Sequence, residues 1–509
     1  MAPQHRRNFC INPLLSILAV GPFLYFTLTR YINLDFWYDE LTTFLLYACV
    51  PLKKTVTDYS FPNNHIFLNI LNNIYLSCIG LHDLQLLILH PWAIRLLMLM
   101  YALLFLFFLF LIGRKLYGTR TGILCVAVAA TSIPFYNFAT QVRGYVLSMA
   151  LLAAGLYFAI DYAQRQKTRS LVWMTLLFSL LLYTIPLNLY VLFAIGVYFT
   201  LVLLVAVLRK QADWKYSRNI VIGLCCSVGI ASLLYAPVLG EVIHNRFVTS
   251  LGLFSLPILT DVTPTMFLFF LSNRFYLIVI LALGLTLALW KKAYRSPFLL
   301  LFLTIYAIPF LASFVRGDNY IYRLYVNLVG VFSLLVVACF DAIFRIPKLQ
   351  RYKTPVIALL ILGMGGTFVM TVHRLERSWT TDIATGQRLL NTYSNWHQYF
   401  YDVRGIVDLT RQAEKGRDIP VNVMKKDVDE LSMPWYLKRF GVAHSVCASD
   451  DALRFGPGGE ALVITGFPDV VAARLEKTYP GLACRRLNAD LRFHNLLECR
   501  LPGKGGTEK

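Results

Sequence analysis

The sequence is poor in charged residues, and poorest in acidic ones. Charged side chains make up 15% of the 509 residues, and 28 Asp and Glu stand against 48 Lys and Arg. A soluble domain carries about 25% charged residues. Apolar residues make up 57% of the chain. This composition excludes a disordered chain, a collagen-like chain and a small disulfide scaffold, and it indicates an integral membrane protein.

The sequence also has no internal repeat, no low-complexity linker and no zinc-type spacing among its ten cysteines. Most of the cysteines fall in or near apolar blocks, where Cys behaves as a small apolar residue. Cys484 and Cys499 lie in two strand-like runs near the C-terminus. Their spacing allows a hairpin disulfide in an oxidising compartment.

Apolar residues are concentrated in blocks of about 17–25 residues, the length that a helix needs to cross about 30 Å of hydrocarbon. The stretch 65–81 is also apolar but carries three asparagines, and we predict that it forms a helix at the outer membrane interface. Eleven crossings are predicted, at 12–29, 92–112, 121–137, 144–161, 171–187, 189–208, 219–239, 265–290, 297–315, 324–344 and 355–371.

The composition changes after residue 372, where charged residues, glycine and proline return. Short strand-like and helical runs alternate there, which predicts a small α/β domain. We therefore expect a transmembrane domain over 1–372 and a soluble α/β domain over 373–509. The expected strands are 421–424, 461–465 and 496–501, and the expected helices are 427–440 and 470–478.

Lys and Arg gather in alternate loops between the apolar blocks, as in Arg114-Lys115 and Lys291-Lys292. The positive-inside rule makes these loops cytoplasmic. With eleven crossings, the N-terminus then lies in the cytoplasm and the C-terminal domain is periplasmic or extracellular. The net charge of +20 therefore reflects topology, and no nucleic-acid partner is expected.

The first outer loop holds the most unusual polar residues. Asp39 and Glu40 follow Trp37 and Tyr38 directly, at the membrane edge where aromatic residues gather. A carboxylate among aromatic rings is a candidate general base. The alternative is that both carboxylates only stabilise the positive end of an interfacial helix.

Two further outer motifs could contact a phosphate. The run Pro62-Asn63-Asn64-His65 opens the predicted interfacial helix, and free backbone N–H groups at a helix start suit an anion. Arg143-Gly-Tyr145 lies between two apolar blocks, where an arginine needs a buried carboxylate or a ligand phosphate. A solvated histidine and an arginine that reaches the lipid headgroups are the alternatives.

Two later outer segments complete the candidate residues. Glu241 and His244 have the i, i+3 spacing of a weak candidate metal site for a divalent ion. Arg316, Arg323 and Tyr325 suggest a phosphate clamp for a lipid headgroup.

Together, Trp37-Tyr38-Asp39-Glu40, Pro62-Asn63-Asn64-His65 and Arg143-Gly-Tyr145 resemble the C-type (GT-C) glycosyltransferase superfamily. The likeness is to the branch of protein O-mannosyltransferases and bacterial aminoarabinose transferases, and it covers roughly residues 10–330. It implies Asp39 as the general base and Glu40 as its supporting neighbour. Arg143 takes the position of the family's Arg-Tyr motif, and Arg323 that of a late basic residue that faces the lipid phosphate. The bacterial branch often has Lys-Pro-Pro or His-Pro-Pro where this chain has Pro-Asn-Asn-His.

The resemblance implies transfer of a sugar from a polyprenyl phosphate to a glycan, lipid or protein hydroxyl on the outer face of the membrane. A single direct displacement would invert the anomeric centre. Two other classes stay open: a polytopic transporter, and a non-catalytic subunit that binds or assembles lipid-linked glycans. A transporter usually shows internal repeats and interrupted spans, and polar residues here gather in outer loops instead.

Overall fold

The chain forms two units in a computed structural model, a large helical unit and a smaller unit with a sheet. The large unit contains residues 1–32, 43–84 and 93–371, and the smaller one contains 33–42, 85–92 and 372–509. The expected division at residue 372 did not foresee that 33–42 and 85–92 pack with the C-terminal segment. The structure describes residues 2–210, 214–244, 254–296, 298–317, 322–385, 403–425, 432–488 and 494–502.

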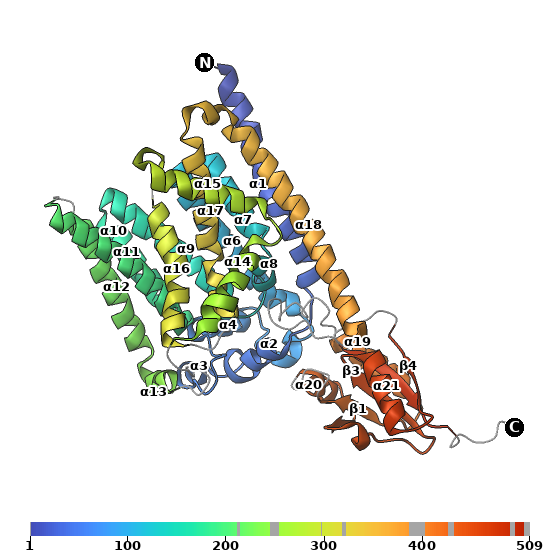
Figure 1. The fold of residues 1–509 in the computed structure, drawn as a ribbon. Helices are drawn as coiled ribbons and strands as arrows, with labels where there is room; N and C mark the ends of the chain where they lie inside the picture. The colour runs from blue at the N-terminus through green and yellow to red at the C-terminus, as the bar shows by residue number, and fades with distance from the viewer. Residues whose placement is uncertain are drawn as a thin grey trace. The chain divides into compact units, whose positions relative to one another are not determined.

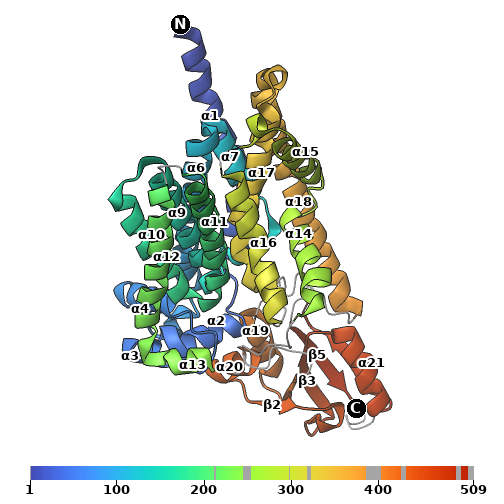
Figure 2. The same cartoon turned by 60° about the vertical axis from the view of Figure 1, so that its left-hand side comes forward.

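Helices account for nearly all of the large unit, and they run side by side as a bundle (Figures 1 and 2). The helices of its first half are α1 (Ala2–Phe26), α3 (Leu52–Thr57), α4 (Ile66–Cys78), α6 (Pro91–Tyr117), α7 (Thr119–Ala130), α8 (Ile133–Phe138), α9 (Gly144–Arg165), α10 (Thr168–Thr184) and α11 (Leu189–Leu208). Those that follow are α12 (Trp214–Leu234), α13 (Leu239–Ile243), α14 (Thr263–Leu271), α15 (Tyr276–Trp290), α16 (Leu299–Arg316), α17 (Val329–Phe344) and α18 (Lys353–Thr385).

Shorter 3₁₀ and π segments join or extend these helices. They are η1 (Thr27–Tyr31), η2 (Phe44–Ala48), η3 (Pro186–Asn188), η4 (Ala236–Val238), η5 (Ile258–Val262), η6 (Lys292–Tyr294), η7 (Tyr322–Leu328) and η8 (Pro347–Tyr352). The helices α3, α4 and α13 gather at one end of the bundle (Figures 1 and 2).

Eight helices of the described residues are long and apolar enough to cross a membrane. Two more predicted crossings coincide with the shorter apolar helices α7 and α10. The stretch 65–81 forms the 13-residue helix α4, which is shorter than the roughly 20 residues of a crossing. The protein is therefore an integral membrane protein with the predicted fold class, and the side of the membrane for each terminus stays a prediction.

The predicted crossing at 265–290 is wrong as a single straight helix. α14 and α15 meet at an angle of 109°. Ser272 and Asn273 have φ values of +49° and +63°, and this left-handed backbone ends α14. A second difference lies in 121–137, where α7 stops at Ala130 and Pro134 opens the separate helix α8.

Ion pairs join the helices at the ends where the basic clusters lie. Lys115 of α6 pairs with Asp161 of α9. Asp341 of α17 accepts from Arg345 at 2.9 Å and from Lys353 of α18 at 3.1 Å. These carboxylates neutralise part of the basic clusters that the positive-inside rule assigns to the cytoplasm.

The C-terminal segment folds around a five-stranded sheet of order β2-β1-β3-β5-β4. β1 is parallel to β2 and β3, whereas β5 is antiparallel to β3 and β4. The predicted small α/β domain is thus confirmed. The strands are β1 (Val421–Met424), β2 (His444–Cys447), β3 (Glu460–Thr465), β4 (Ala483–Arg486) and β5 (Asn495–Arg500).

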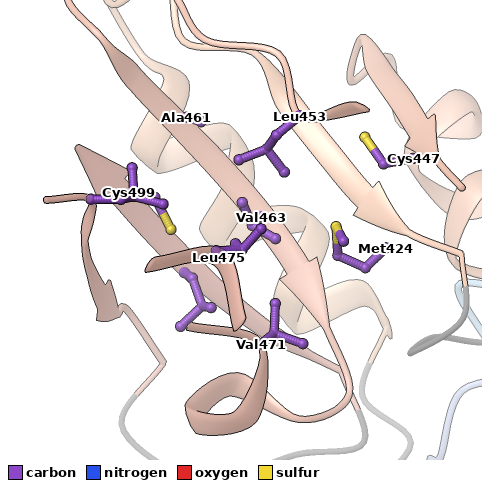
Figure 3. Packing of buried hydrophobic residues seen from close by; sticks show 10 residues of the cluster. Met424, Cys447, Leu453, Ala461, Val463, Val471, Leu475 and Cys499 are labelled. Atoms are coloured by element: carbon purple, nitrogen blue, oxygen red, sulfur yellow. The ribbon is translucent and has the colours of Figure 1, made fainter. Parts of the chain in front are cut away.

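Helices of the smaller unit follow from local sequence signals. α21 (Pro468–Thr478) begins with Pro468 at its first position and Asp469 in its first turn. Val471 and Leu475 lie four residues apart, so one helical face packs both side chains into the core of the sheet (Figure 3). The other helices are α2 (Tyr38–Thr43), α5 (Leu84–Leu87), α19 (Val403–Glu414) and α20 (Ser432–Arg439).

The predicted helices and disulfide of this segment can now be compared with the structure. α21 confirms the helix expected over 470–478. For the helix expected over 427–440, residues 426–431 lie outside the described residues and the remainder forms α20. Cys484 and Cys499 are directly opposite each other on β4 and β5 and form the disulfide that their spacing allowed.

Candidate active site

The two predicted catalytic carboxylates lie in the first turn of α2. The Leu41 N–H donates to the Trp37 carbonyl at 2.8 Å, which makes Trp37 the N-cap of this helix. The Glu40 carboxylate accepts from the Trp37 backbone N–H at 3.4 Å, the reciprocal contact of a capping box. Glu40 therefore stabilises the first turn of α2. Its neighbour Asp39, the predicted general base, is also buried.

Arg143 lies at the start of α9 and contacts two other segments of the large unit. Its Nη2 group donates to the Asn63 side-chain oxygen at 3.1 Å, and its Nη1 group lies 3.5 Å from the Thr43 hydroxyl. Arg143 is buried, with 2% of its surface exposed. The structure thus brings together two motifs that are 80 residues apart in the sequence.

His65 and Tyr145 belong to the same cluster. The His65 ring lies 5.8 Å from the Tyr145 ring, and the Arg143 guanidinium carbon lies 5.9 Å from the Tyr145 ring centre. A Cβ atom added to Gly144 would lie 2.8 Å from Cγ of His65. Glycine at this position therefore lets the imidazole pack closely against the start of α9. We call Asn63, His65, Arg143 and Tyr145 the arginine cluster.

Asn64 has a different task from its neighbour Asn63. Its amide donates to the carbonyls of Thr55 at 2.8 Å and Asp58 at 2.6 Å, and its side-chain oxygen accepts from Asn69 at 3.0 Å. These bonds hold the loop that leads into α4. The predicted contact of Asn64 with the sugar-phosphate donor remains a prediction. The hydrogen bonds of its side chain stabilise the conformation of this loop.

The late basic residues lie on other elements of the large unit. Arg316 ends α16, and its Nη1 group lies 3.2 Å from the Tyr190 hydroxyl. Arg323 and Tyr325 lie in η7, which packs against α9. The Tyr325 ring stacks on Phe310 at 4.6 Å. Their predicted role as a phosphate clamp stays a prediction.

The weak candidate metal pair has other interactions. Glu241 accepts a hydrogen bond from the backbone N–H of Tyr59, and His244 Nδ1 lies 3.0 Å from the Gly240 carbonyl. Within the described residues, no group of three His, Cys, Asp or Glu side chains could hold a metal ion. Binding of a divalent metal by Glu241 and His244 therefore remains a prediction.

Two residues that support the arginine cluster were not among the predicted site residues. Thr43 contacts Arg143 directly, as described above. Arg95 of α6 is buried, and its Nη1 group donates to the Thr140 carbonyl at 3.2 Å, in the loop before Arg143. A single arginine within the apolar block 92–112 was the available signal, because a charge at that depth usually has a specific task.

The comparison with solved structures shows a membrane fold with a small α/β domain, like that of ArnT. ArnT from Cupriavidus metallidurans bound to undecaprenyl phosphate aligns over 100% of both chains, with a TM-score of 0.50 and 14% identity. Its apo structure aligns with a TM-score of 0.52 and 14% identity, over 99% of this chain and 100% of that chain. The resemblance that the sequence motifs indicate is confirmed as a likeness of fold.

Other comparisons are more distant. The oligosaccharyltransferase from Archaeoglobus fulgidus in complex with Zn and sulfate aligns with a TM-score of 0.41 and 12% identity. That alignment covers 86% of this chain and 62% of the oligosaccharyltransferase. No protein-family model and no curated protein matches this sequence.

Proposed function

We propose that this integral membrane protein is a glycosyltransferase that moves a sugar from a polyprenyl phosphate to an acceptor hydroxyl. The acceptor is a glycan, a lipid or a protein. The observation that carries the proposal is the arginine cluster, in which Asn63 and Tyr145 contact Arg143 and His65 packs against Tyr145. The cluster lies within a fold like that of ArnT, one structure of which is bound to undecaprenyl phosphate.

The chemistry of Arg143 suits a lipid phosphate. A guanidinium keeps its charge in a buried site and presents several N–H donors in a plane that matches phosphate oxygens. A polyprenyl chain keeps the donor in the bilayer, so an enzyme that uses it needs a cation in a membrane-embedded domain. Arg143 in this proposal binds the phosphate, and Asn63 and Tyr145 hold the guanidinium in place.

In the proposed reaction, the acceptor oxygen attacks the anomeric carbon while the bond from that carbon to the phosphate oxygen breaks. The bonding electron pair leaves with the polyprenyl phosphate, which gains one negative charge. Arg143 stabilises that charge as it develops. Asp39 accepts the proton of the acceptor hydroxyl, and the single displacement inverts the anomeric centre.

The proposal includes the predicted topology, with the N-terminus in the cytoplasm and the C-terminal domain periplasmic or extracellular. The reaction then takes place on the outer face of the membrane, and its sugar donor is the polyprenyl-phosphate-linked sugar. Arg316, Arg323 and Tyr325 are proposed as further contacts of the lipid headgroup, and Asn64 as part of the donor site through the loop that it shapes.

Binding of undecaprenyl phosphate to the purified full-length chain tests the proposal. We expect the lipid to raise the unfolding temperature in a concentration-dependent manner, because a ligand that binds only the folded state stabilises it. Undecaprenol, which lacks the phosphate, should give no comparable shift. Substitution Arg143→Ala should weaken binding of undecaprenyl phosphate about 10–100-fold, the range of a charged hydrogen bond.

The matched control is Arg114→Ala. Arg114 is exposed near the end of α6, with its guanidinium carbon 5.5 Å from the Phe110 ring centre, outside the arginine cluster. Its removal should leave the affinity unchanged. Equal binding of undecaprenyl phosphate and undecaprenol, or an equal loss of affinity in Arg143→Ala and Arg114→Ala, contradicts the proposal.

Two further measurements separate the remaining alternatives. Movement of a lipid-linked sugar across the membrane of vesicles without release of polyprenyl phosphate would favour a transporter. The assay is run with and without a chelator to test the predicted metal at Glu241 and His244.

A further inference from the structure

The segment before α2 is tied to the C-terminal part of the chain within the smaller unit. Asp35 accepts from the backbone N–H of Arg404 at 2.8 Å and forms an ion pair with the Arg404 guanidinium. The same guanidinium lies 3.4 Å from the Asn33 carbonyl. These partners are separated by about 370 residues in the sequence, so the contact is made by tertiary folding alone.

The charge of this ion pair is largely removed from water. The Asp35 side chain is 2% exposed and that of Arg404 is 29% exposed. Arg404 lies in the first turn of α19, whose positive end also favours a carboxylate. Asp35 therefore interacts with a guanidinium and a helix start together, an arrangement that holds a carboxylate in one position.

A second contact fixes the next residue. The Phe36 backbone N–H donates to the Tyr436 hydroxyl at 3.3 Å, and both residues are fully buried. Burial, with a smaller contribution from the Asp35 charge, raises the pKa of Tyr436 well above its usual value. Tyr436 is therefore a neutral phenol at physiological pH and a stable hydrogen-bond partner.

Both contacts immediately precede the predicted base in the sequence. Trp37 is the N-cap of α2 and Asp39 lies in its first turn, four residues after Asp35. A span of four residues reaches at most about 14 Å. An anchor at Asp35 and Phe36 therefore restricts where the start of α2, and the Asp39 carboxylate on it, can lie.

We propose that Arg404 and Tyr436 are positioning residues for Asp39. Through them, the C-terminal domain fixes the start of α2 and the Asp39 carboxylate on it in the position that the reaction needs. This inference rests on the proposed function. A misplacement of about 1 Å in a catalytic group can cost about 100-fold in rate. The domain thus acts on the chemical step through Asp35 and Phe36, in addition to any contact that it makes with an acceptor.

The test compares turnover and lipid binding in the full-length chain. For Arg404→Ala we expect kcat to fall about 10–100-fold, while the affinity for undecaprenyl phosphate stays within twofold of wild type. Arg404→Lys keeps the charge but loses the planar fork of donors, and it should restore part of kcat. If Asp35→Asn and Arg404→Ala act on one contact, the double variant should lose little more than the worse single variant.

The matched control is Arg500→Ala in the same domain. Arg500 is 55% exposed and forms its ion pairs with Glu460 and Glu498 on the sheet. Its removal should leave kcat unchanged. Wild-type kcat in a folded Arg404→Ala variant overturns the inference, as does a parallel loss of kcat, lipid affinity and thermal stability.

The Arg404→Lys and Asp35→Asn variants decide the matter if Arg404→Ala does not fold. With the interaction weakened but the chain folded, unchanged kcat in both contradicts a positioning role. Failure of the proposed function is distinguishable, since wild type itself would then turn over no lipid-linked sugar. If wild type is active and the Arg404 and Asp35 variants have the same kcat, the positioning role is contradicted and the proposed function still stands.

Discussion

Two buried arginines of the large unit, Arg274 and Arg143, look alike in the sequence but have different surroundings in the structure. Arg274 is fully buried, and its guanidinium donates at 2.7–2.8 Å to three carbonyl oxygens and to the Thr131 hydroxyl. The carbonyls belong to the last turns of α7 and α14, whose negative ends stabilise a cation. Arg143 contacts the side chains of Asn63 and Thr43 at the longer distances of 3.1 and 3.5 Å.

The difference separates a structural cation from a candidate ligand-binding one. Arg274 joins the C-terminal ends of α7 and α14, beside the turn between α14 and α15. It donates to carbonyl oxygens of the last helical turns, which lack an intrahelical donor. Arg143 contacts Asn63, which belongs to one of the motifs that resemble the GT-C superfamily, and Thr43, which lies outside them. Substitutions should therefore affect the fold in one case and the reaction in the other.

The largest effect is expected for Arg274→Met. The substitution removes the guanidinium donor of the buried carbonyl oxygens of Val128 and Phe270, at a cost of about 1–3 kcal/mol for each in the free energy of unfolding. Thermal unfolding of the purified protein should report this loss. A variant of wild-type stability would show that the turn does not depend on the Arg274 contacts.

Arg143→Ala should have the second-largest effect, and on turnover instead of stability. Loss of a cation that stabilises developing charge lowers kcat about 10²–10³-fold. The release of polyprenyl phosphate measures this loss, with the unfolding temperature as the control. Equal destabilisation by Arg143→Ala and Arg274→Met would erase the distinction between the two arginines.

Gly144→Ala tests the arginine cluster without removing any polar group. The added Cβ would lie 2.8–3.1 Å from three atoms of His65, so the buried imidazole must move. Forced shifts in a packed site cost about 1–3 kcal/mol, and we expect about a tenfold loss of kcat. The matched control is Gly21→Ala, because a Cβ added to Gly21 would lie in open space. Gly118 is not suitable, since its positive φ would strain an alanine. Equal activity in Gly144→Ala and Gly21→Ala would contradict close packing of His65.

The smallest effect concerns the opposite arrangement, a buried carboxylate surrounded by arginines. Burial alone would raise the pKa of Glu498, but Arg417, Arg485 and Arg500 outweigh it and hold that pKa below its usual value. The stabilising contribution is therefore complete at neutral pH and is lost as the pH falls below about 4. Unfolding between pH 3 and 7 should show this loss for wild type and a smaller one for Glu498→Gln. Identical pH profiles would contradict the ionised pairing.

The fold class could be predicted from the sequence because long apolar blocks and alternating basic loops specify helices in a membrane. The turn at Ser272 and Asn273 was missed, since left-handed backbone at two non-glycine residues leaves no periodic signal. The Ser-Asn-Arg interruption of an apolar run was the available clue.

The candidate site was predicted in part, through motifs that carry unusual polar residues. Arg143 and His65 do lie together, but sequence spacing could not separate Asn63, which contacts Arg143, from Asn64, which holds the loop. Nor could it show that Glu40 caps α2 or that residues 33–42 pack with the C-terminal domain. Such assignments depend on contacts between distant segments, and sequence spacing does not report those contacts.

The most direct test of the central claim is turnover of a panel of polyprenyl-phosphate sugars by wild type and Asp39→Asn. The account predicts that wild type consumes a donor and releases polyprenyl phosphate. The variant should bind the same donor with similar affinity and react about 10²–10⁴-fold more slowly, because it lacks the general base. Equal turnover by the variant, or no turnover of any donor by wild type, would contradict the account.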